Sequence, residues 1–362
     1  MLAPGPVTAR PAVGLMLAAA LSCLGADCSR KAPPQEHCVP VDAAPPEPGY
    51  ADDANDSTPL RPPAEVVHVA EAMNGLLIHG TDAFYRDIAR AIVRLPLAGR
   101  VPEIAAPACG DERAIFAVHD ATICCVERIE RAEHEDGGDE IACTPLGGGP
   151  RRVLREHLPT VESLALDATD AYVGLRGAAG VSRIRRSDGQ ATLDGTNGDR
   201  HAGAQHIVLD GDTVYWNGPG GMFAASKNAA PGASTFKGPR SHGPIALGAD
   251  AVYWGDGGGE DASAHDDVIW RRKKADGAFE ALTTGEGAAQ YLGVTDRHVY
   301  WWTRYFTLRR VHRLGGSPRT IGRRLTIHFM VGVGEDVYWM EGEPGRQTLY
   351  RLADATRVTQ DD

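Results

Sequence analysis

The segment from 255 to 267 holds the residues with the clearest potential for metal chemistry. It reads GDGGGEDASAHDD and is rich in carboxylates. Ca²⁺ takes several carboxylate oxygens on a flexible backbone, and the side chains that could supply them are Asp256, Glu260, Asp261, Asp266 and Asp267. The run lacks the fixed spacing of a known calcium loop, so a solvated acidic loop is the simpler interpretation. The sequence therefore predicts no cofactor, and calcium is the ion that it suggests as an alternative.

A second set of residues could combine acids and bases at one mouth of a ring-shaped fold. Glu341 and Glu343 with Arg304 and His201 would suit a lyase or a glycosidase if they converged. Trp302 could add an aromatic platform for a sugar. However, no GxSxG, Walker or Rossmann string stands in a strand–turn–helix context. The sequence favours a non-catalytic binding module, with a propeller enzyme or a calcium-stabilised structural protein as alternatives.

The cysteines indicate an oxidising compartment and a lipid anchor. Residues 1–22 read as a signal peptide, and ALSC at 20–23 resembles a bacterial lipobox, in which Cys23 would be lipidated. Cleavage after the A-x-A of 18–20 is the alternative. The cysteines that remain can pair outside the cytoplasm, and they are Cys28, Cys38, Cys109, Cys124, Cys125 and Cys143.

Two of these cysteines, Cys124 and Cys125, are adjacent on one strand and therefore face opposite sides. We expect Cys143 to pair with one of them and Cys109 with the other, while Cys28 and Cys38 pair with each other in the segment that precedes the domain. Buried free thiols are the competing interpretation.

The rest of the composition limits the partners. Residues 23–64 are rich in Pro, Asp and Ala and read as a disordered tether. The formal net charge is -11, so a polyanion such as DNA would be repelled and no nucleic-acid partner is expected. The sequence predicts a monomeric cell-envelope lipoprotein that faces the periplasm or the cell surface and binds a protein or a glycan.

Seven copies of one strand pattern organise residues 65–362. Each has an acidic residue followed by an apolar-aromatic triplet, and the acids are Asp82, Asp120, Asp170, Asp212, Asp250, Asp296 and Asp336. Successive acids are 38 to 50 residues apart, close to the ~40–45 residues of a four-stranded propeller blade. The sequence predicts an all-β, seven-bladed β-propeller, with blades at about 75–107, 108–156, 160–196, 203–239, 243–285, 288–322 and 326–360.

Each blade has strands A to D. Strand A leads through a tight turn to the aromatic strand B; strand C alternates apolar and basic residues, and strand D is short. In strand B, Val and Trp point one way and Tyr the other, so we expect these rings to fill the contacts between blades. The clearest aromatics are Tyr215, Trp216, Tyr253, Trp254, Tyr300, Trp301, Tyr338 and Trp339.

Long segments gather on one face of such a ring. The A–B and C–D turns share one face, and the B–C and D–A loops share the other. The segments 127–140, 194–204 and 255–267 all belong to the second face. Because loop variation on a repeat scaffold usually marks the binding face, the sequence places function there.

The Val-Tyr-Trp strands and the Gly-rich turns resemble the Tyr-Trp-Thr-Asp (YWTD) propeller repeats of low-density-lipoprotein receptors. They are also similar to bacterial repeats of the NHL and streptogramin-lyase type, and to uncharacterised predicted myxobacterial lipoproteins. The likeness covers roughly residues 75–360. The run Trp301-Trp302-Thr303-Arg304 comes nearest to the receptor motif and ends in Arg. The resemblance thus implies a fold and carries over no catalytic residue.

Overall fold

The computed structural model describes residues 60–99, 101–129, 138–177, 180–194, 203–218, 221–228, 236–239, 243–256, 268–285, 287–343 and 345–353. All of them belong to one compact unit. These segments form strands and turns, as expected for short alternating runs separated by Gly-rich turns. No helix in them is long and apolar enough to span a membrane.

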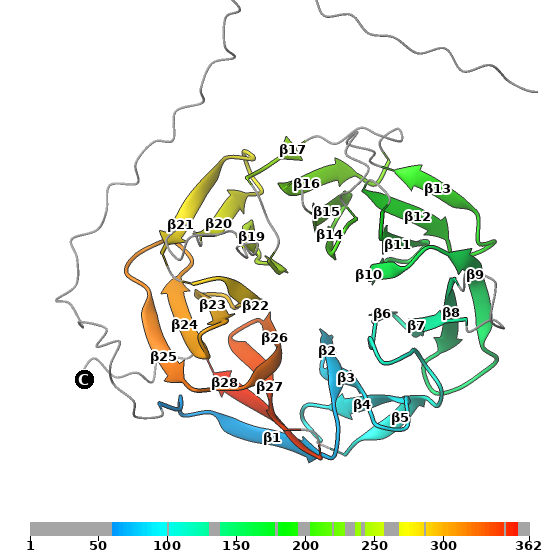
Figure 1. Cartoon of the computed structure of the whole chain (residues 1–362), viewed down its shortest axis with the longest axis horizontal. Coiled ribbons are helices and arrows are strands. Elements are labelled where there is room, and N and C mark those ends of the chain that lie inside the picture. Colours follow the sequence, from blue (N-terminus) through cyan, green and yellow to red (C-terminus); the bar gives the residue numbers. More distant parts are fainter. Residues whose placement is uncertain are drawn as a thin grey trace, which may run out of the picture. The chain divides into compact units, whose positions relative to one another are not determined.

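Seven four-stranded antiparallel sheets surround a central axis, so the fold is a seven-bladed β-propeller (Figure 1). This confirms the predicted fold class. Blade 1 contains β2 (Asn74–His79), β3 (Asp82–Arg86), β4 (Ile92–Pro96) and β5 (Glu103–Ala106). Blade 2 contains β6 (Phe116–His119), β7 (Thr122–Arg128), β8 (Asp139–Pro145) and β9 (Arg152–Leu158). Blade 3 contains β10 (Val161–Leu166), β11 (Asp170–Leu175), β12 (Val181–Arg185) and β13 (Ala191–Asp194).

The later blades repeat the same order from the axis outward. Blade 4 contains β14 (His206–Asp210), β15 (Thr213–Gly218), β16 (Gly221–Ser226) and β17 (Phe236–Lys237). Blade 5 contains β18 (Ile245–Leu247), β19 (Ala251–Gly255), β20 (Val268–Lys273) and β21 (Phe279–Thr284). Blade 6 contains β22 (Ala289–Val294), β23 (His298–Thr303), β24 (Thr307–His312) and β25 (Arg319–Arg323).

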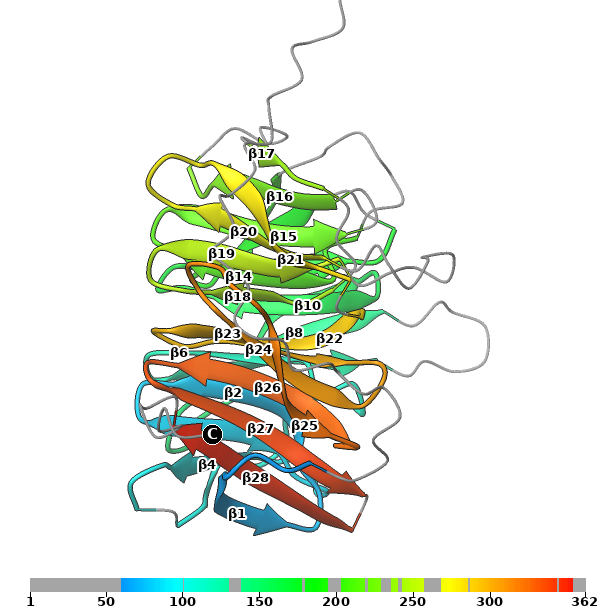
Figure 2. The same ribbon diagram turned by 90° about the vertical axis from the view of Figure 1, so that its left-hand side faces the viewer.

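Blade 7 closes the ring with strands from both ends of the domain. It contains β26 (Ile327–Val333), β27 (Asp336–Glu343) and β28 (Arg346–Ala353), and its outermost strand is β1 (Glu65–Ala70). Figure 2 shows β1 in blue beside β28 in red. The two strands are antiparallel, with Glu65 opposite Arg351 and Ala70 opposite Gln347. The first and last parts of the propeller are thus held in one sheet.

The core consists of seven clusters of buried side chains, one at each contact between neighbouring blades. Tyr253 of blade 5 packs in one cluster with Val299 and Trp301 of blade 6. In the next cluster, Tyr300 of blade 6 packs with Trp339 of blade 7. None of the eight triplet aromatics singled out from the sequence exposes more than 5% of its surface. The aromatic strands therefore hold the blades together.

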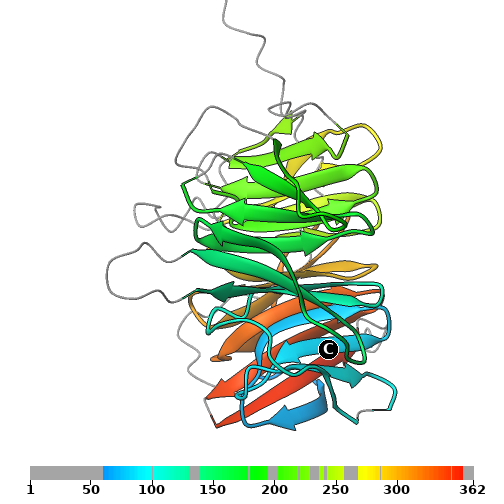
Figure 3. The ribbon, with the colours of Figure 1, turned by 90° about the vertical axis from the view of Figure 1, so that its right-hand side faces the viewer.

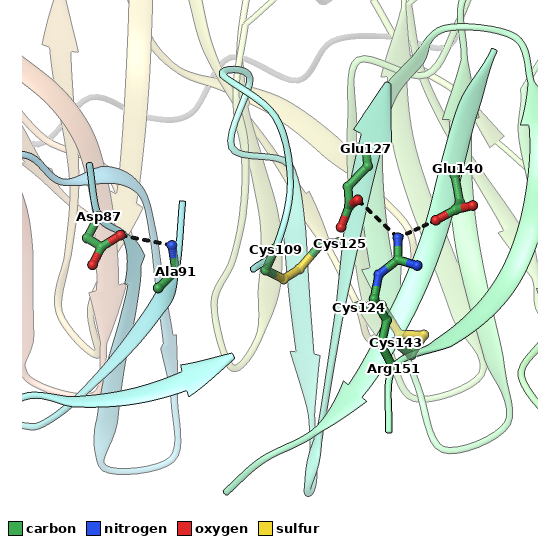
Figure 4. Close-up of a disulfide and its surroundings, with 9 residues drawn as sticks. All are labelled: Asp87, Ala91, Cys109, Cys124, Cys125, Glu127, Glu140, Cys143 and Arg151. Carbon is green, nitrogen blue, oxygen red and sulfur yellow. Dashed lines mark hydrogen bonds and ion pairs between the residues drawn. A yellow bond between two sulfur atoms is a disulfide. The ribbon is translucent and has the colours of Figure 1, made fainter. Parts of the chain in front are cut away.

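Two disulfides reinforce blade 2 on opposite faces (Figure 4). Cys109–Cys125 lies in the cluster shared with blade 1, and Cys124–Cys143 lies in the cluster shared with blade 3. This pairing selects one of the two arrangements that the sequence leaves open for the cysteines of this blade. The expected pair of Cys28 and Cys38 lies outside the described residues.

Candidate functional site

A recurrent ion pair joins neighbouring blades on the face that carries the A–B and C–D turns. Its cation stands directly after the third strand of one blade, and its carboxylate comes from the A–B turn region of the preceding blade. We call these pairs the interblade clasps. Among the described residues there are three with an N–O distance of 2.9 Å, and they are Lys227–Asp167, Lys274–Asp210 and Arg313–Asp250.

The clasp between blades 3 and 4 shows how the carboxylate is stabilised. Asp167 accepts hydrogen bonds from the amides of Thr169 and Asp170 and, at 3.0 Å, from the hydroxyl of Tyr172. Burial alone would raise the pKa of Asp167, but the hydrogen bonds from Lys227 and from the two amides hold it well below the usual value. The clasp carboxylate is therefore ionised at neutral pH.

The clasp is missing between blades 2 and 3, although its cation is present. Arg186 follows β12 as Lys227 follows β16, and each amide donates to the A–B turn of its own blade. The guanidinium of Arg186 has no carboxylate partner among the described residues. Instead, its Nη1 donates to the carbonyl oxygens of Asp167 and Ala168 in its own blade.

In blade 2 a histidine occupies the place that the clasp acids Asp167 and Asp210 take in blades 3 and 4. His119 pairs across its turn with the residue three positions later, as Asp210 does in blade 4. The neighbouring Asp120 has a side chain that is 76% exposed, and its carboxylate lies 3.1 Å from the ring of His119. The carboxylate of this turn therefore contacts His119 of its own blade.

A cleft of about 660 Å³ lies where the clasp is missing. It is built from the A–B turn of blade 3 and the C–D turns of blades 2 and 3, which belong to the part of the ring seen in Figure 3. Its charged lining residues are Arg152, Arg185, Arg186 and Asp170. Hydroxyl groups come from Thr122, Thr144, Thr169 and Ser187, and apolar surface comes from Cys143, Pro145, Pro150, Leu154 and Ala168.

The three guanidiniums of the cleft are oriented by few contacts. Nη2 of Arg152 donates to the carbonyl oxygen of Ser187. Nη1 of Arg185 lies 2.9 Å from the carboxylate of Asp188, which is on the surface. Each guanidinium therefore has several N–H donors without a partner among the described residues, and the lining has more positive than negative groups. This positive cleft contrasts with the net charge of -11 of the whole chain.

The same two blades are tied firmly at the opposite face. Arg113 lies between Asp111 and the buried Asp139, with its Nη1 at 2.7 Å from the Asp139 carboxylate. That carboxylate also accepts a hydrogen bond from the amide of Val161, the first residue of β10. Burial would lower the pKa of Arg113, but its hydrogen bonds to the two carboxylates raise it. The gap between blades 2 and 3 is therefore closed at one end and open at the other.

A smaller hollow of about 320 Å³ lies at blade 1, beside the end of β1. Tyr85, Ile88 and Ile104 give it an apolar lining, and Glu71 and Asp87 are at its edge. Asp87 has a structural role, because its carboxylate accepts a hydrogen bond from the amide of Ala91 (Figure 4). The hollow is on the face that the sequence favours for binding.

The residues expected at the mouth of the ring are held by local contacts. Trp302 is buried, and its Nε1 donates to the carbonyl oxygen of Leu325 at 2.9 Å. The guanidinium of Arg304 lies 5.1 Å from the ring centre of Tyr305. Trp302 therefore packs inside the contact between blades 6 and 7 and presents no open platform.

Glu341 is a buried carboxylate that forms an ion pair with Arg61, a residue at the start of the described domain. We call residues 60–64 the closing strap, because the amide of Arg323 in blade 6 donates to Leu60 and Arg61 binds Glu341 in blade 7. The two Arg61–Glu341 contacts are 2.7 and 3.1 Å long. Glu343, two residues further along, is exposed.

Several residues singled out from the sequence lie outside the described residues, namely Cys23, His201, Glu260, Asp261, Asp266 and Asp267. Asp256 is described; it is half-buried, and its amide donates to the carbonyl oxygen of Val268 at 2.8 Å. In the described part of the chain, no three His, Cys, Asp or Glu side chains are grouped so that they could hold a metal ion.

The sequence analysis did not select the arginines of the cleft. They belong to two Arg-Arg pairs, at 151–152 and 185–186, and each pair flanks the C–D turn of its blade. One pair precedes the C–D turn of blade 3 and the other follows the C–D turn of blade 2, and two Arg-Arg pairs beside the same turn in successive blades are the signal that could have found them. It was missed because basic residues recur on the third and fourth strands of most blades.

Comparisons with known proteins support the fold and do not assign a family. No family model matches the chain, and no curated protein matches it. Among solved structures, it is similar to the β-propeller domain of Cps50 (Swd1) from Myceliophteria thermophila, with a TM-score of 0.58, 10% identity, and 80% of this chain and 100% of that chain covered. It is also similar to BamB from Moraxella catarrhalis, with a TM-score of 0.50, 12% identity, and 78% and 86% of the two chains covered.

A third similar structure is the computationally designed Ika8 protein. The TM-score is 0.54 at 12% identity, over 77% of this chain and 83% of that chain. Identities this low show a shared fold alone. The chain is thus a seven-bladed β-propeller whose function must be argued from its own surface.

Proposed function

We propose that this protein is an exported, non-catalytic β-propeller that binds a protein partner in the cleft between blades 2 and 3. The observation that carries the proposal is the cleft itself, an open space of about 660 Å³ in a ring whose next three blade contacts are clasped. A rigid scaffold with a local opening at its turns is a common basis for binding.

Export is supported by the disulfides. Cys109–Cys125 and Cys124–Cys143 are both deeply placed in blade 2, and bonds of this kind persist in oxidising compartments. The lipid anchor at Cys23 and the kinship with YWTD or NHL repeats remain predictions of the sequence. If Cys23 carries the anchor, Cys23→Ser should move the protein from the membrane fraction to the soluble fraction. An unchanged distribution would rule out lipidation at this residue.

Site-specific photo-crosslinking in the native host tests the binding site. The photoreactive amino acid p-benzoylphenylalanine would replace Ser187, an exposed residue of the cleft, in the full-length protein. Leu314 is the matched control, because it is also exposed and follows the corresponding cation, Arg313, in blade 6. Glu343 serves as the probe for the opposite face.

The expected result is a discrete adduct from Ser187 that is absent from Leu314. An adduct from Glu343 alone would place binding on the face with the long loops and reject the cleft. Identical adducts from all three positions would show that the contacts are nonspecific and would also reject it.

A further inference from the structure

The missing clasp indicates what kind of group the cleft receives. Arg186 stands in the place of Lys227, Lys274 and Arg313, and each of those cations is met by a carboxylate at 2.9 Å from the preceding blade. At Arg186 the preceding blade has His119 in the place of Asp167 and Asp210, and no carboxylate of the described residues meets the guanidinium. The site therefore has the cation of an ion pair and lacks its anion.

We propose that the cleft recognises a carboxylate-rich segment of the partner protein, with Arg186, Arg152 and Arg185 receiving its side-chain carboxylates. This inference rests on the proposed function, whose ligand it names. Guanidinium groups suit the task because their planar N–H donors match a carboxylate in a bidentate geometry. A carboxylate of the ligand would then pair with Arg186 between blades 2 and 3, as the chain's own carboxylates pair with Lys227, Lys274 and Arg313 at the following blade contacts.

The remaining lining favours a peptide over a sugar. None of the described residues that line the cleft is aromatic, whereas sugar sites commonly use an aromatic face. The hydroxyls of Thr122, Thr144 and Ser187 can instead bond to the N–H and C=O groups of a peptide backbone. Cys143 of the Cys124–Cys143 disulfide, together with Pro145 and Pro150, supplies apolar surface. The methylene groups of the ligand's acidic side chains can pack against this surface.

Fluorescence anisotropy with defined peptides tests the inference on the full mature chain. The probe is fluorescein-labelled hexaglutamate, and labelled hexaglutamine is its neutral control. We expect hexaglutamate to bind and hexaglutamine not to bind. Affinity should fall several-fold as NaCl rises from about 20 to about 300 mM, because the contacts are solvent-accessible.

Matched variants then place the binding in the cleft. Arg152→Gln with Arg185→Gln should weaken hexaglutamate binding by about tenfold or more, since two charged contacts are lost. Arg155→Gln with Arg176→Gln is the control, because it removes the same charge from the same two blades at exposed residues that do not line the cleft. We expect it to change the affinity less than about twofold.

A third variant restores the missing carboxylate. His119→Asp puts an acid in the place that Asp210 occupies in blade 4, so Arg186 should be clasped and hexaglutamate should bind about tenfold more weakly. The variant should remain folded by circular dichroism, since it adds an interaction found at the following blades. It keeps the inference testable even if the double arginine variant fails to fold.

Three outcomes would overturn the inference. These are no binding of hexaglutamate to the wild type, equal losses in the cleft and control variants, and full displacement of the peptide by inorganic phosphate at matched ionic strength. The last would identify a site for a small oxyanion. A partner crosslinked at Ser187 without any affinity for hexaglutamate would leave the proposed function standing and reject only the acidic ligand.

Discussion

Removing the guanidinium of Arg61 tests whether the closing strap stabilises the ring through Glu341. The side chain of Glu341 is 8% exposed and that of Arg61 is 58% exposed, so the pair is neither fully buried nor fully in solvent. Unit charges about 4 Å apart interact by about 1 kcal/mol in water and by about 4 kcal/mol at an effective dielectric constant of 20. Because solvent screens Arg61, the lower part of this range applies, and Arg61→Met should cost about 1–2 kcal/mol.

The assay is urea unfolding together with calorimetry on Arg61→Met, Glu341→Gln and the double variant. For a domain of this size, a loss of about 1–2 kcal/mol should lower the melting temperature by about 2–5 °C. In the Glu341→Gln background, Arg61→Met should have an effect close to zero, because the charge that it would leave unpaired has been removed.

Arg176→Met is the control for the Arg61 prediction. Arg176 also pairs with a carboxylate, at 2.8 Å from Glu162, but its side chain is 70% exposed. Such a pair should contribute less than about 0.5 kcal/mol. If Arg61→Met costs no more than Arg176→Met, or costs the same with and without Glu341→Gln, the reasoning about the strap is refuted.

Three further predictions concern blade 2, a clasp and a buried hydroxyl. Replacing Cys124 and Cys143 together by Ala should cost about 3 kcal/mol in urea unfolding, because their disulfide closes a loop with a sequence separation of 19; an unchanged midpoint would contradict this. Asp167 has a lowered pKa, so its stabilisation is present above the unfolded value of about 3.9 and is lost as the pH falls. Asp167→Asn should therefore destabilise the protein at pH 7 and have a shrinking effect below about pH 4, whereas a constant effect would contradict the prediction. Burial raises the pKa of Tyr253 to about 12, so its neutral form contributes stability below pH ~10 that is lost as the pH rises towards 12. Tyr253→Phe should remove this alkaline loss in pH-dependent unfolding, and an alkaline loss that stays unchanged would contradict the prediction.

The sequence was sufficient to predict the propeller because its signals are local and repeated. Val-Tyr-Trp alternation fixes which side chains face each neighbouring blade, and the acidic turns fix where the strands reverse. Ring closure could not be predicted in the same way. The strand β1 is one short run, EVVHVA, directly after the tether, and its partner β28 begins at Arg346. No local pattern links two segments so far apart.

The cleft between blades 2 and 3 was harder to predict, because it depends on the absence of a carboxylate partner for Arg186 among the described residues of the A–B turn of blade 2. The sequence shows Arg186 plainly, but only the register shows that His119 stands where Asp210 stands in blade 4. At the mouth of the ring the sequence misled in the opposite way, because it suggested a site from residues that have other contacts in the structure. Glu341 has the chemistry of a catalytic acid, yet Arg61 binds it from a segment that the sequence analysis assigned to the tether.

The cleft and the disulfides of blade 2 have a common cause in its aromatic strand. Where blades 4 to 7 have Val-Tyr-Trp, blade 2 has Ile123, Cys124 and Cys125. Cys124 takes the place of the tyrosine that faces the next blade, and in blade 3 that tyrosine, Tyr172, also donates to the clasp carboxylate. A blade without these rings buries less surface against its neighbours, and disulfides on both of its faces offset the loss. Cysteine side chains are also smaller than aromatic ones, and Cys143 of the Cys124–Cys143 disulfide lines the cleft. In blade 2, two disulfides thus stand where other blades pack aromatic rings, and the adjoining turn at His119 leaves Arg186 without a carboxylate partner among the described residues.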